Sequence, residues 1–393
     1  MTSILTINAG STTVKFAVFT ITEHGVKKAH YGLVDKITTK PAILVKLQGQ
    51  TVLAKDLVIP AATDPYDYVF HSIVTWLQQN NIEIVAAGHR VAHGKKFTHS
   101  MLINDEVMTY LESLNPLAPL HQPYSLEGIR ILRKKFPEIP QLACFDTSFH
   151  TTCNSLSQLF AIPKKLTQQG IRRYGFHGLS YEYIVSQFEH YLPKKKMTGK
   201  FIIAHLGGGA SMCAVANQKS VATTLSFSAL DGLPMGTRCG NIDPGVLLHL
   251  MDHYKMDYTQ LEKLLYKESG LLGVSCLSSD MRVLLESDSE DAKLAVDLFV
   301  YKIAAWIGML TAELQGLDGL IFTAGIGENA PYIREKICER TAWLGGKIDK
   351  NKNNAGNAEI HDTASKLLIY VIPTDEEATI AKNVLACLKK IPI

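Results

Sequence analysis

Residues 201–215 constrain the fold more than any other stretch of the chain. An apolar run, FIIAHL, leads into Gly207, Gly208 and Gly209, and a second apolar run follows. Two strands joined by glycines can bring bare backbone N–H groups against a ligand, because no Cβ atom blocks the approach. Successive N–H groups in such a turn bind anions, and phosphate is a common ligand. The alternative is a tight hairpin that binds nothing.

Residues 4–22 repeat this pattern in the other half of the chain. The run ILTI leads into the small polar turn NAGSTT, and an alternating strand starts at Val14. Two such hairpins indicate an internally duplicated fold that holds one ligand from both sides. Asn8 suits a turn, and its side chain could also reach a metal ion directly or through water. Lys15 lies between apolar neighbours and could be no more than a solvated strand lysine.

Two further strands end in polar residues that suit a binding site. Residues 82–87 lead into GHRVAHG, which contains Arg90, and residues 142–145 lead into Asp146. Ligands of α/β sheets bind at the carboxyl ends of the strands. Taken alone, the histidines of GHRVAHG are more typical of structural roles, and Asp146 is either a helix N-cap or a catalytic group. The character of the chain changes after Asp146, which predicts a domain boundary there.

A strand, a glycine loop and a helix are indicated by the run LDGLIFTAGIGENAPYIREKI. Its Gly325, Gly327 and Ala330 match the dinucleotide pattern G-x-G-x-x-A. A dinucleotide-binding domain also needs an acidic residue about 20 positions further on, after its second strand. Residues 345–358 are instead polar and rich in lysine, asparagine and glycine, which disfavours a dehydrogenase. We expect a loop that receives the base or sugar of a nucleotide, followed by a helix that Asn329 caps.

Composition excludes several classes of protein. With 393 residues, the chain is long enough for two or three domains. Its formal net charge of +3 gives no strong basic excess for binding nucleic acid. The N-terminus carries no signal-peptide pattern, and no apolar run is long enough to span a membrane. Seven scattered cysteines without a CxxC pair indicate reduced thiols, so we expect a cytoplasmic protein without nucleic-acid or membrane partners.

Nine motifs follow one another along essentially the whole chain: NAGSTTVKF, GHRVAHG, LAPLHQP, FDTSFH, RRYGFHG, AHLGGGAS, GLPMGTRCGNIDP, FTAGIGEN and IPTDEE. This set resembles the acetokinase family. The resemblance implies an α/β, duplicated ribonuclease-H-like fold, shared with actin-like ATPases, in two domains with an active-site cleft between them. The first domain would comprise residues 1–147 and a closing helix at 376–393. The second would comprise residues 148–375 and carry the nucleotide site and the dimer contact.

The resemblance also implies an activity and partners. Acetate kinases of this family transfer a phosphoryl group directly, in line and reversibly, between ATP and acetate, giving acetyl phosphate and ADP. They use Mg²⁺, with Mn²⁺ as a substitute, and usually form homodimers through the second domain. A helical pattern over residues 291–315 is apolar on several faces, so it either packs centrally or forms a subunit contact.

Roles for individual residues come from matching the family's motifs position by position. The magnesium positions match Asn8 and Glu376. The ATP or ADP positions match Lys15, His205, Leu206, Gly207, Gly208, Gly209, Asp280, Met281, Arg282, Gly325, Ile326, Gly327, Glu328 and Asn329. The catalytic positions match Arg90, Asp146, His177 and Arg238. The positions that hold the carboxylic acid match Arg90, Ala92, Leu120, Phe176 and Ala229.

These roles make chemical sense, because ATP and acetate are both anions. Arginines and Mg²⁺ neutralise that charge before the reacting oxygens approach each other. His177 matches a residue that donates a hydrogen bond to the equatorial oxygens of the transition state. Asp146 matches the family's proton acceptor. Since acetate is already ionised at neutral pH, we expect Asp146 to orient Arg90 or Arg238 rather than to take a proton.

Some positions depart from the family's usual pattern. Gly208 stands where asparagine is common, which removes a side-chain donor to phosphate. Ala92 and Ala229 stand where acetate kinases often have valine and proline in the pocket for the methyl group. At the position of Ala92, propionate kinases of the family also have an alanine-like residue. One methylene in such a pocket is worth roughly 1–3 kcal/mol of discrimination. We expect acetate as the physiological substrate with appreciable use of propionate, and a propionate kinase is the alternative.

A second class of function would use the same fold without catalysis. An actin-like protein that ATP switches between conformations needs no acceptor site, since fold alone does not fix function. The set Arg90, Asp146, His177 and Arg238 argues against this class. The two classes differ in whether ATP turnover depends on added carboxylate.

Overall fold

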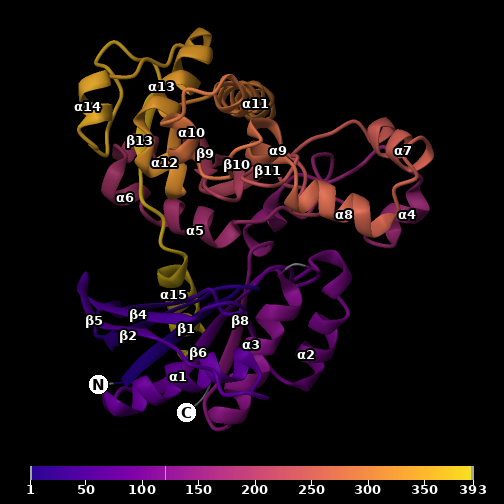
Figure 1. Ribbon diagram of the computed structural model, residues 1–393. Helices are drawn as coiled ribbons and strands as arrows, with labels where there is room; N and C mark the ends of the chain where they lie inside the picture. Colours follow the sequence, from indigo (N-terminus) through magenta and orange to yellow (C-terminus); the bar gives the residue numbers. More distant parts are fainter. Residues whose placement is uncertain (1, 120, 391–393) are drawn as a thin grey trace. The chain divides into compact units, whose positions relative to one another are not determined.

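The chain forms two compact units. The structure is a computed structural model that describes residues 2–119 and 121–390, so the predicted pocket residue Leu120 lies outside the described residues. Unit 1 comprises Met1–Phe149 and Asp375–Ile393, and unit 2 comprises His150–Thr374. The last helix therefore belongs to the same unit as the first strands, as its yellow ribbon among the violet strands shows (Figure 1).

The sheet of unit 1 has the strand order β5-β4-β3-β2-β1-β6-β8-β7. The strands are β1 (Thr2–Ala9), β2 (Val14–Thr22), β3 (Gly25–Asp35), β4 (Ala42–Leu47), β5 (Gln50–Asp56), β6 (Glu83–Val91), β7 (Met101–Leu102) and β8 (Gln141–Phe145). The first five strands are antiparallel neighbours joined by turns, whereas β6 is parallel to β1 and β8 is parallel to β6.

Helices cover both faces of this sheet. They are α1 (Pro65–Gln79), α2 (Asp105–Glu112), α3 (Gln122–Lys135) and α15 (Glu376–Leu388), with a 3-10 turn at Asn115–Leu117. Ala87 of β6 packs in the core that α1 and α3 form with β1. A Cβ atom on the next residue, Gly88, would lie 2.5 Å from Ile380 and 2.6 Å from Val384 of α15. Successive strand residues point to opposite faces, so the glycine lets α15 approach the second face.

The sheet of unit 2 has the strand order β11-β10-β9-β12-β13. The strands are β9 (Lys200–Leu206), β10 (Ala210–Ala216), β11 (Lys219–Thr223), β12 (Gly319–Thr323) and β13 (Leu368–Val371). The first three are antiparallel, and β12 and β13 continue the sheet in parallel from β9.

The two sheets contain the same five-strand pattern. In unit 1, β3-β2-β1-β6-β8 is an antiparallel meander followed by two parallel strands, and β11-β10-β9-β12-β13 repeats that order and direction. The hairpin predicted at residues 4–22 is β1–β2, and the hairpin predicted at 201–215 is β9–β10. The predicted duplicated ribonuclease-H-like α/β fold is therefore confirmed.

Helices surround the smaller sheet of unit 2. They are α4 (Lys164–Gln168), α5 (Gly178–Ser186), α6 (Phe188–Tyr191), α7 (Pro244–Asp252), α8 (Tyr258–Lys267), α9 (Gly270–Ser275), α10 (Met281–Leu285), α11 (Glu290–Leu314), α12 (Ala324–Asn329), α13 (Pro331–Arg340) and α14 (Lys350–Asn354). Short 3-10 turns lie at Lys194–Lys196 and Ala342–Leu344, and the turn Ser148–Thr152 contains the change from unit 1 to unit 2 along the chain.

The long helix α11 packs centrally in unit 2. By length and composition it is the one helix in the described part of the chain that could cross a membrane. Its Phe299, Ile303 and Ile307 are fully buried and join the core around β9 and β12. One face of α11 therefore packs in the core of unit 2, which accounts for part of its apolar composition. Its Leu294 and Tyr301 remain exposed.

The glycine segment after β12 differs from its prediction. It is the short helix α12, not a loop, and Ala324 starts it with a φ of 64°, a left-handed value that is rare for alanine. The Asn329 side chain donates to the Gly325 carbonyl over 2.9 Å within this helix. It therefore does not cap the next helix, α13, whose N-cap is Ala330. The prediction of the Asn329 cap was wrong.

Candidate active site

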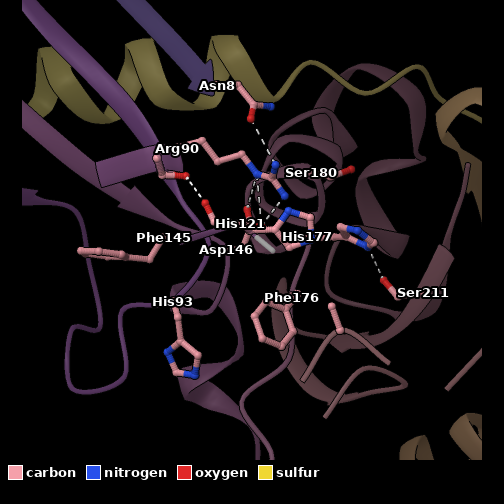
Figure 2. Close-up of polar contacts among 12 residues, drawn as sticks. Asn8, Arg90, His93, His121, Phe145, Asp146, Phe176, His177, Ser180 and Ser211 are labelled. Atoms are coloured by element: carbon pink, nitrogen blue, oxygen red, sulfur yellow. Dashed lines mark hydrogen bonds and ion pairs between the residues drawn. The ribbon is translucent and has the colours of Figure 1, made fainter. Parts of the chain in front are cut away.

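In unit 1, neighbouring strands bring Arg90 and Asp146 together. Arg90 lies in β6, and Asp146 follows the last residue of β8, where Val91 and Phe145 are paired. The Nε atom of Arg90 lies 3.2 Å and 3.1 Å from the two carboxylate oxygens, and its Nη2 lies 2.6 Å from Oδ2 (Figure 2). Asp146 is buried, and its carboxylate binds an arginine, which favours a role in the site over a helix cap.

Asn8 and Glu376 extend this cluster. Arg90 donates through Nη1 to Oδ1 of Asn8 over 3.1 Å (Figure 2). Glu376 is the first residue of α15, and its pKa is raised to about 7, chiefly by burial. The negative charges of Asp146 and Glu377 also raise this pKa, whereas the positive charges of Arg90 and Lys15 lower it.

The charge of Arg90 is secured by its surroundings. Burial by itself lowers the pKa of Arg90, but the carboxylates of Asp146 and Glu376 outweigh burial and hold it above its ordinary value. A guanidinium whose Nε and Nη2 are already engaged by one carboxylate is fixed in orientation. It presents a permanent positive charge at the end of β6.

Other predicted residues of unit 1 lie on the same strands. Lys15 of β2 pairs in register with Asn8 of β1, and its side chain is exposed. Ala92 follows the end of β6 and is 3% exposed, so its methyl group is packed inside the unit.

In unit 2, His177 and His205 form a stacked pair. Their ring centroids are 4.3 Å apart, and their planes differ by 21°. His177 is the N-cap of α5 with a left-handed φ of 58°, and its Nδ1 lies 2.7 Å from Oγ of Ser211 (Figure 2). His205 lies near the end of β9, and its Nδ1 lies 2.8 Å from Oγ of Ser180.

A cavity of about 770 Å³ opens beside the glycine turn of unit 2. It brings together eight of the predicted nucleotide residues, which are Gly207, Gly208, Asp280, Met281, Arg282, Gly325, Ile326 and Asn329. Asp280 caps α10 and also binds the guanidinium of Arg282, with Nη2 2.6 Å from Oδ2, and this hydrogen bond holds the pKa of Asp280 below its usual value.

The other predicted nucleotide residues of unit 2 do not line this cavity. Leu206 is fully buried in the core, and a Cβ atom on Gly209 would face His177. Oε1 of Glu328 accepts from the backbone N–H groups of Ala324 over 2.8 Å and of Thr374 over 3.1 Å. Glu328 thus stabilises the tight start of α12.

Arg238 lies in the irregular segment between β11 and α7. Its Nη1 donates to the Ala229 carbonyl over 3.1 Å and contacts Sδ of Met235 at 3.5 Å. The same segment reaches the glycine turn, because Gly236 N–H donates to the Gly208 carbonyl over 3.2 Å. Phe176, which precedes His177, is buried.

The family model for the acetokinase family matches residues 3–382. The chain belongs to the acetokinase family. It is 46% identical over 388 residues to the acetate kinase of Rickettsia akari, which covers 98% of this chain and 99% of the relative. The acetate kinase of Methylocella silvestris is 43% identical over 399 residues, with 98% of each chain covered.

Solved structures of the acetokinase family share this fold. A propionate kinase from Francisella tularensis superposes with a TM-score of 0.90 at 39% identity, covering 98% of this chain and 99% of that one. The acetate kinase of Porphyromonas gingivalis superposes with a TM-score of 0.87 at 32% identity, covering 99% and 100%.

Motif matching within the acetokinase family missed several residues of the site. Ser279 and Leu285 line the cavity but were not predicted, and Ala330, which completes the G-x-G-x-x-A pattern, was not assigned to the site. Ser279 and Ala330 directly adjoin predicted residues in the sequence, so widening the motifs by one position would have found them. Ser211, which contacts His177, ends the motif AHLGGGAS, but no local pattern connects it to a histidine 34 positions away.

Proposed function

We propose that the protein is an acetate kinase that transfers the terminal phosphoryl group of ATP reversibly to acetate. The observation that carries this proposal is the cluster around Arg90, where Asp146 holds the guanidinium and Asn8 and Glu376 lie close to it. An ATP-switched scaffold needs no second-substrate site, whereas a carboxylate kinase needs a fixed cation to bind its acceptor. The full-length acetate kinase relatives support the same reaction.

Charge neutralisation is the main task of such a site. Arg90 and Arg238 would bind the carboxylate and the transferring phosphoryl group, so that two anions can approach each other. Asp146 acts by fixing Arg90, since the acetate oxygen that attacks phosphorus carries no proton at neutral pH.

His177 is suited to stabilise the transferring group. A Cβ atom placed on Gly209 would lie 3.3 Å from its Nε2, so the ring presents that nitrogen to the glycine turn. The turn at residues 207–209 offers backbone N–H groups to phosphate. A hydrogen bond from Nε2–H to the equatorial oxygens would strengthen as charge spreads over them in the transition state.

The nucleoside of ATP would occupy the cavity of unit 2. Its volume of about 770 Å³ suits a ligand of nucleotide size, and the glycine turn lies at its wall. Ile326 and Met281 offer apolar surface to the base, while Asp280 and Asn329 offer polar atoms. ATP and ADP are therefore the proposed nucleotides.

Mg²⁺ would be held by Asn8 and Glu376. In residues 2–119 and 121–390, no group of three or more His, Cys, Asp or Glu is arranged to hold a metal. Mg²⁺ usually takes only one or two carboxylates, with phosphates and waters as its other ligands. A cation near Glu376 would favour the ionised form of a carboxyl whose pKa is raised to about 7, so Glu376 fits such an ion. Oδ1 of Asn8 accepts one hydrogen bond from Arg90 and keeps a second lone pair for the ion. Bound there, Mg²⁺ (or Mn²⁺) supplies positive charge to the phosphate oxygens.

Acetate is the proposed acceptor, and propionate the second candidate. The small side chains of Ala92 and Ala229 favour room for one more methylene, and a related propionate kinase has the same fold. We propose that both acids are phosphorylated, with acetate preferred.

The proposed setting is a cytoplasmic homodimer without nucleic-acid or membrane partners. Unit 2 exposes large apolar side chains, among them Leu248, Tyr254, Tyr258 and Trp343. Where such side chains lie side by side they favour a subunit contact, which is the basis for proposing a homodimer through unit 2. Light scattering on the purified protein gives the mass of the assembly and tests the dimer directly.

The deciding experiment measures initial rates with Mg-ATP and acetate, propionate or butyrate, trapping acyl phosphate with hydroxylamine. We expect acetate-dependent hydroxamate, and an Arg90→Ala variant that binds ATP but forms almost none. If the wild-type protein binds ATP and no carboxylate gives product, the chain is a nucleotide-switched binding protein instead.

A further inference from the structure

We propose that Ser211 and Tyr181 are positioning residues that fix the tautomer of His177, so that its hydrogen sits on Nε2. This inference rests on the proposed function, because it explains how His177 becomes a hydrogen-bond donor to phosphate. It adds two residues to the site that the acetokinase motifs do not assign. All of the contacts that carry it lie within unit 2.

The geometry is a chain of three polar groups. Oγ of Ser211 lies 2.7 Å from Nδ1 of His177, and the Tyr181 hydroxyl is hydrogen-bonded to the same Oγ. Ser211 and Tyr181 are both fully buried. A serine hydroxyl donates one hydrogen and accepts others, while a neutral imidazole has one donor and one acceptor nitrogen. The direction of the chain therefore decides which ring nitrogen carries the hydrogen.

One direction suits an anionic ligand. When Tyr181 donates to Ser211 and Ser211 donates to Nδ1, both hydroxyl hydrogens are used and the ring hydrogen is on Nε2. The opposite tautomer would present the Nε2 lone pair to the glycine turn, where it would repel a phosphate oxygen. Nε2 is the atom nearest to a Cβ placed on Gly209, so this nitrogen is the one that faces the turn.

His150 provides an internal reference for the same geometry. Its Nδ1 lies 2.9 Å from Oγ of Ser220, and its Nε2 lies 2.9 Å from the Phe176 carbonyl. A carbonyl oxygen can only accept, so Nε2 carries the hydrogen and Ser220 donates to Nδ1. Burial lowers the pKa of His150 to about 4, so this ring is neutral. Serine-to-Nδ1 donation thus already occurs in this unit.

A second hydroxyl chain supports the neighbouring ring. Oγ of Ser180 lies 2.8 Å from Nδ1 of His205 and 2.8 Å from Oγ1 of Thr374. His205 stacks on His177, so two parallel rings each have Nδ1 engaged by a serine that has a second hydroxyl behind it. This repetition favours the same tautomer in both rings, with the hydrogen on Nε2 and the serine hydroxyl donating to Nδ1.

The test reads the tautomer and the rate separately. In ¹⁵N-histidine-labelled protein, with His177→Gln for assignment, long-range ¹H–¹⁵N spectra identify the protonated nitrogen of His177. We expect Nε2–H in the wild type and a mixture of tautomers in Ser211→Ala. We expect the kcat of Ser211→Ala to fall about 10- to 100-fold with little change in KM for ATP or acetate.

Two further variants separate positioning from folding. Tyr181→Phe keeps the buried ring and removes only the hydroxyl, and we expect a smaller fall in kcat with the same drift in tautomer. Ser220→Ala is the matched control, because it removes a buried serine bound to Nδ1 of His150, and we expect kcat and the His177 tautomer to stay unchanged.

Two results would overturn the proposal. One is an Nδ1–H tautomer of His177 in the wild type, and the other is a folded Ser211→Ala protein with unchanged tautomer and kcat. Failure of the proposed function would look different, because no carboxylate would be phosphorylated while the tautomer of His177 remained measurable.

Discussion

The guanidinium of Arg90 contacts the carboxylate of Asp146 through both Nε and Nη2, with the shortest distance of 2.6 Å between Nη2 and Oδ2. Asp146 is 1% exposed, so its carboxylate is shielded from water, whereas the Arg90 side chain is 23% exposed. Breaking a buried pair by removing one partner is costly, because the other charge is left uncompensated. The pair supports the proposal that Asp146 acts by positioning Arg90 and not by accepting a proton.

The first prediction concerns this pair. Asp146→Asn keeps the size of the side chain but loses its charge, so Arg90 is held more weakly, and we expect kcat/KM for acetate to fall about 10²- to 10³-fold. A double-mutant cycle with Arg90→Ala isolates the mechanism. If Asp146 acts through Arg90, adding Asp146→Asn to the Arg90→Ala protein changes the rate little. Nearly full kcat in Asp146→Asn with the arginine in place would contradict the positioning role.

The second prediction concerns acyl selectivity. Ala92→Val adds two methyl carbons at a position that is 3% exposed and lies directly after β6. We expect the ratio of kcat/KM for propionate to that for acetate to fall about 10-fold or more, since one methylene is worth roughly 1–3 kcal/mol. The hydroxamate assay measures both rates, and thermal unfolding checks that the valine is accommodated. A wild-type propionate kcat/KM far below that of acetate would refute the wide pocket.

The third prediction contrasts two neighbouring glycines. A Cβ atom on Gly208 meets nothing within 4 Å, whereas one on Gly209 would lie 3.3 Å from Nε2 of His177. We therefore expect Gly208→Asn, which restores a side-chain donor at the cavity wall, to keep kcat and lower KM for ATP. Gly209→Ala should lower kcat instead, because it displaces the imidazole. Equal effects of the two variants on kcat would show that the action of His177 does not depend on the close approach of Gly209 to its ring.

The fourth prediction concerns pH and the stability of the protein without divalent cations. The pKa of Glu376 is raised from 4.5 to about 7, chiefly by burial. As pH rises through this window, the unfolded state releases its proton first, so the folded state loses relative stability. The loss is complete above about pH 7 and absent below about pH 4.5.

Urea unfolding of the wild type and Glu376→Gln in EDTA measures this effect. We expect the free energy of unfolding of the wild type, relative to that of the variant, to decrease as the pH rises from about 4.5 to about 7. The fall should stay below about 3 kcal/mol, because each pKa unit is worth about 1.4 kcal/mol and Glu376 is partly exposed. A rise of relative stability with pH would mean that Glu376 ionises readily in the folded protein.

Much of the fold follows from local sequence patterns. The strand–turn–strand runs at residues 4–22 and 201–215 fold as hairpins because their alternating apolar residues and small turn residues act over short distances. Their repetition predicted the duplication. Arg90 and Asp146 could be singled out because each lies at the end of a strand, where α/β sheets bind ligands.

The tertiary structure decided which of these residues meet. Arg90 and Asp146 are 56 positions apart, and only the pairing of β6 with β8 sets their register. Asn329 forms a bond inside α12 rather than a cap, because the left-handed Ala324 turns the chain directly into a helix. Ser211 meets His177 because β10 lies beside the start of α5. Local patterns place a side chain on a strand or helix, but its partners depend on how the elements pack.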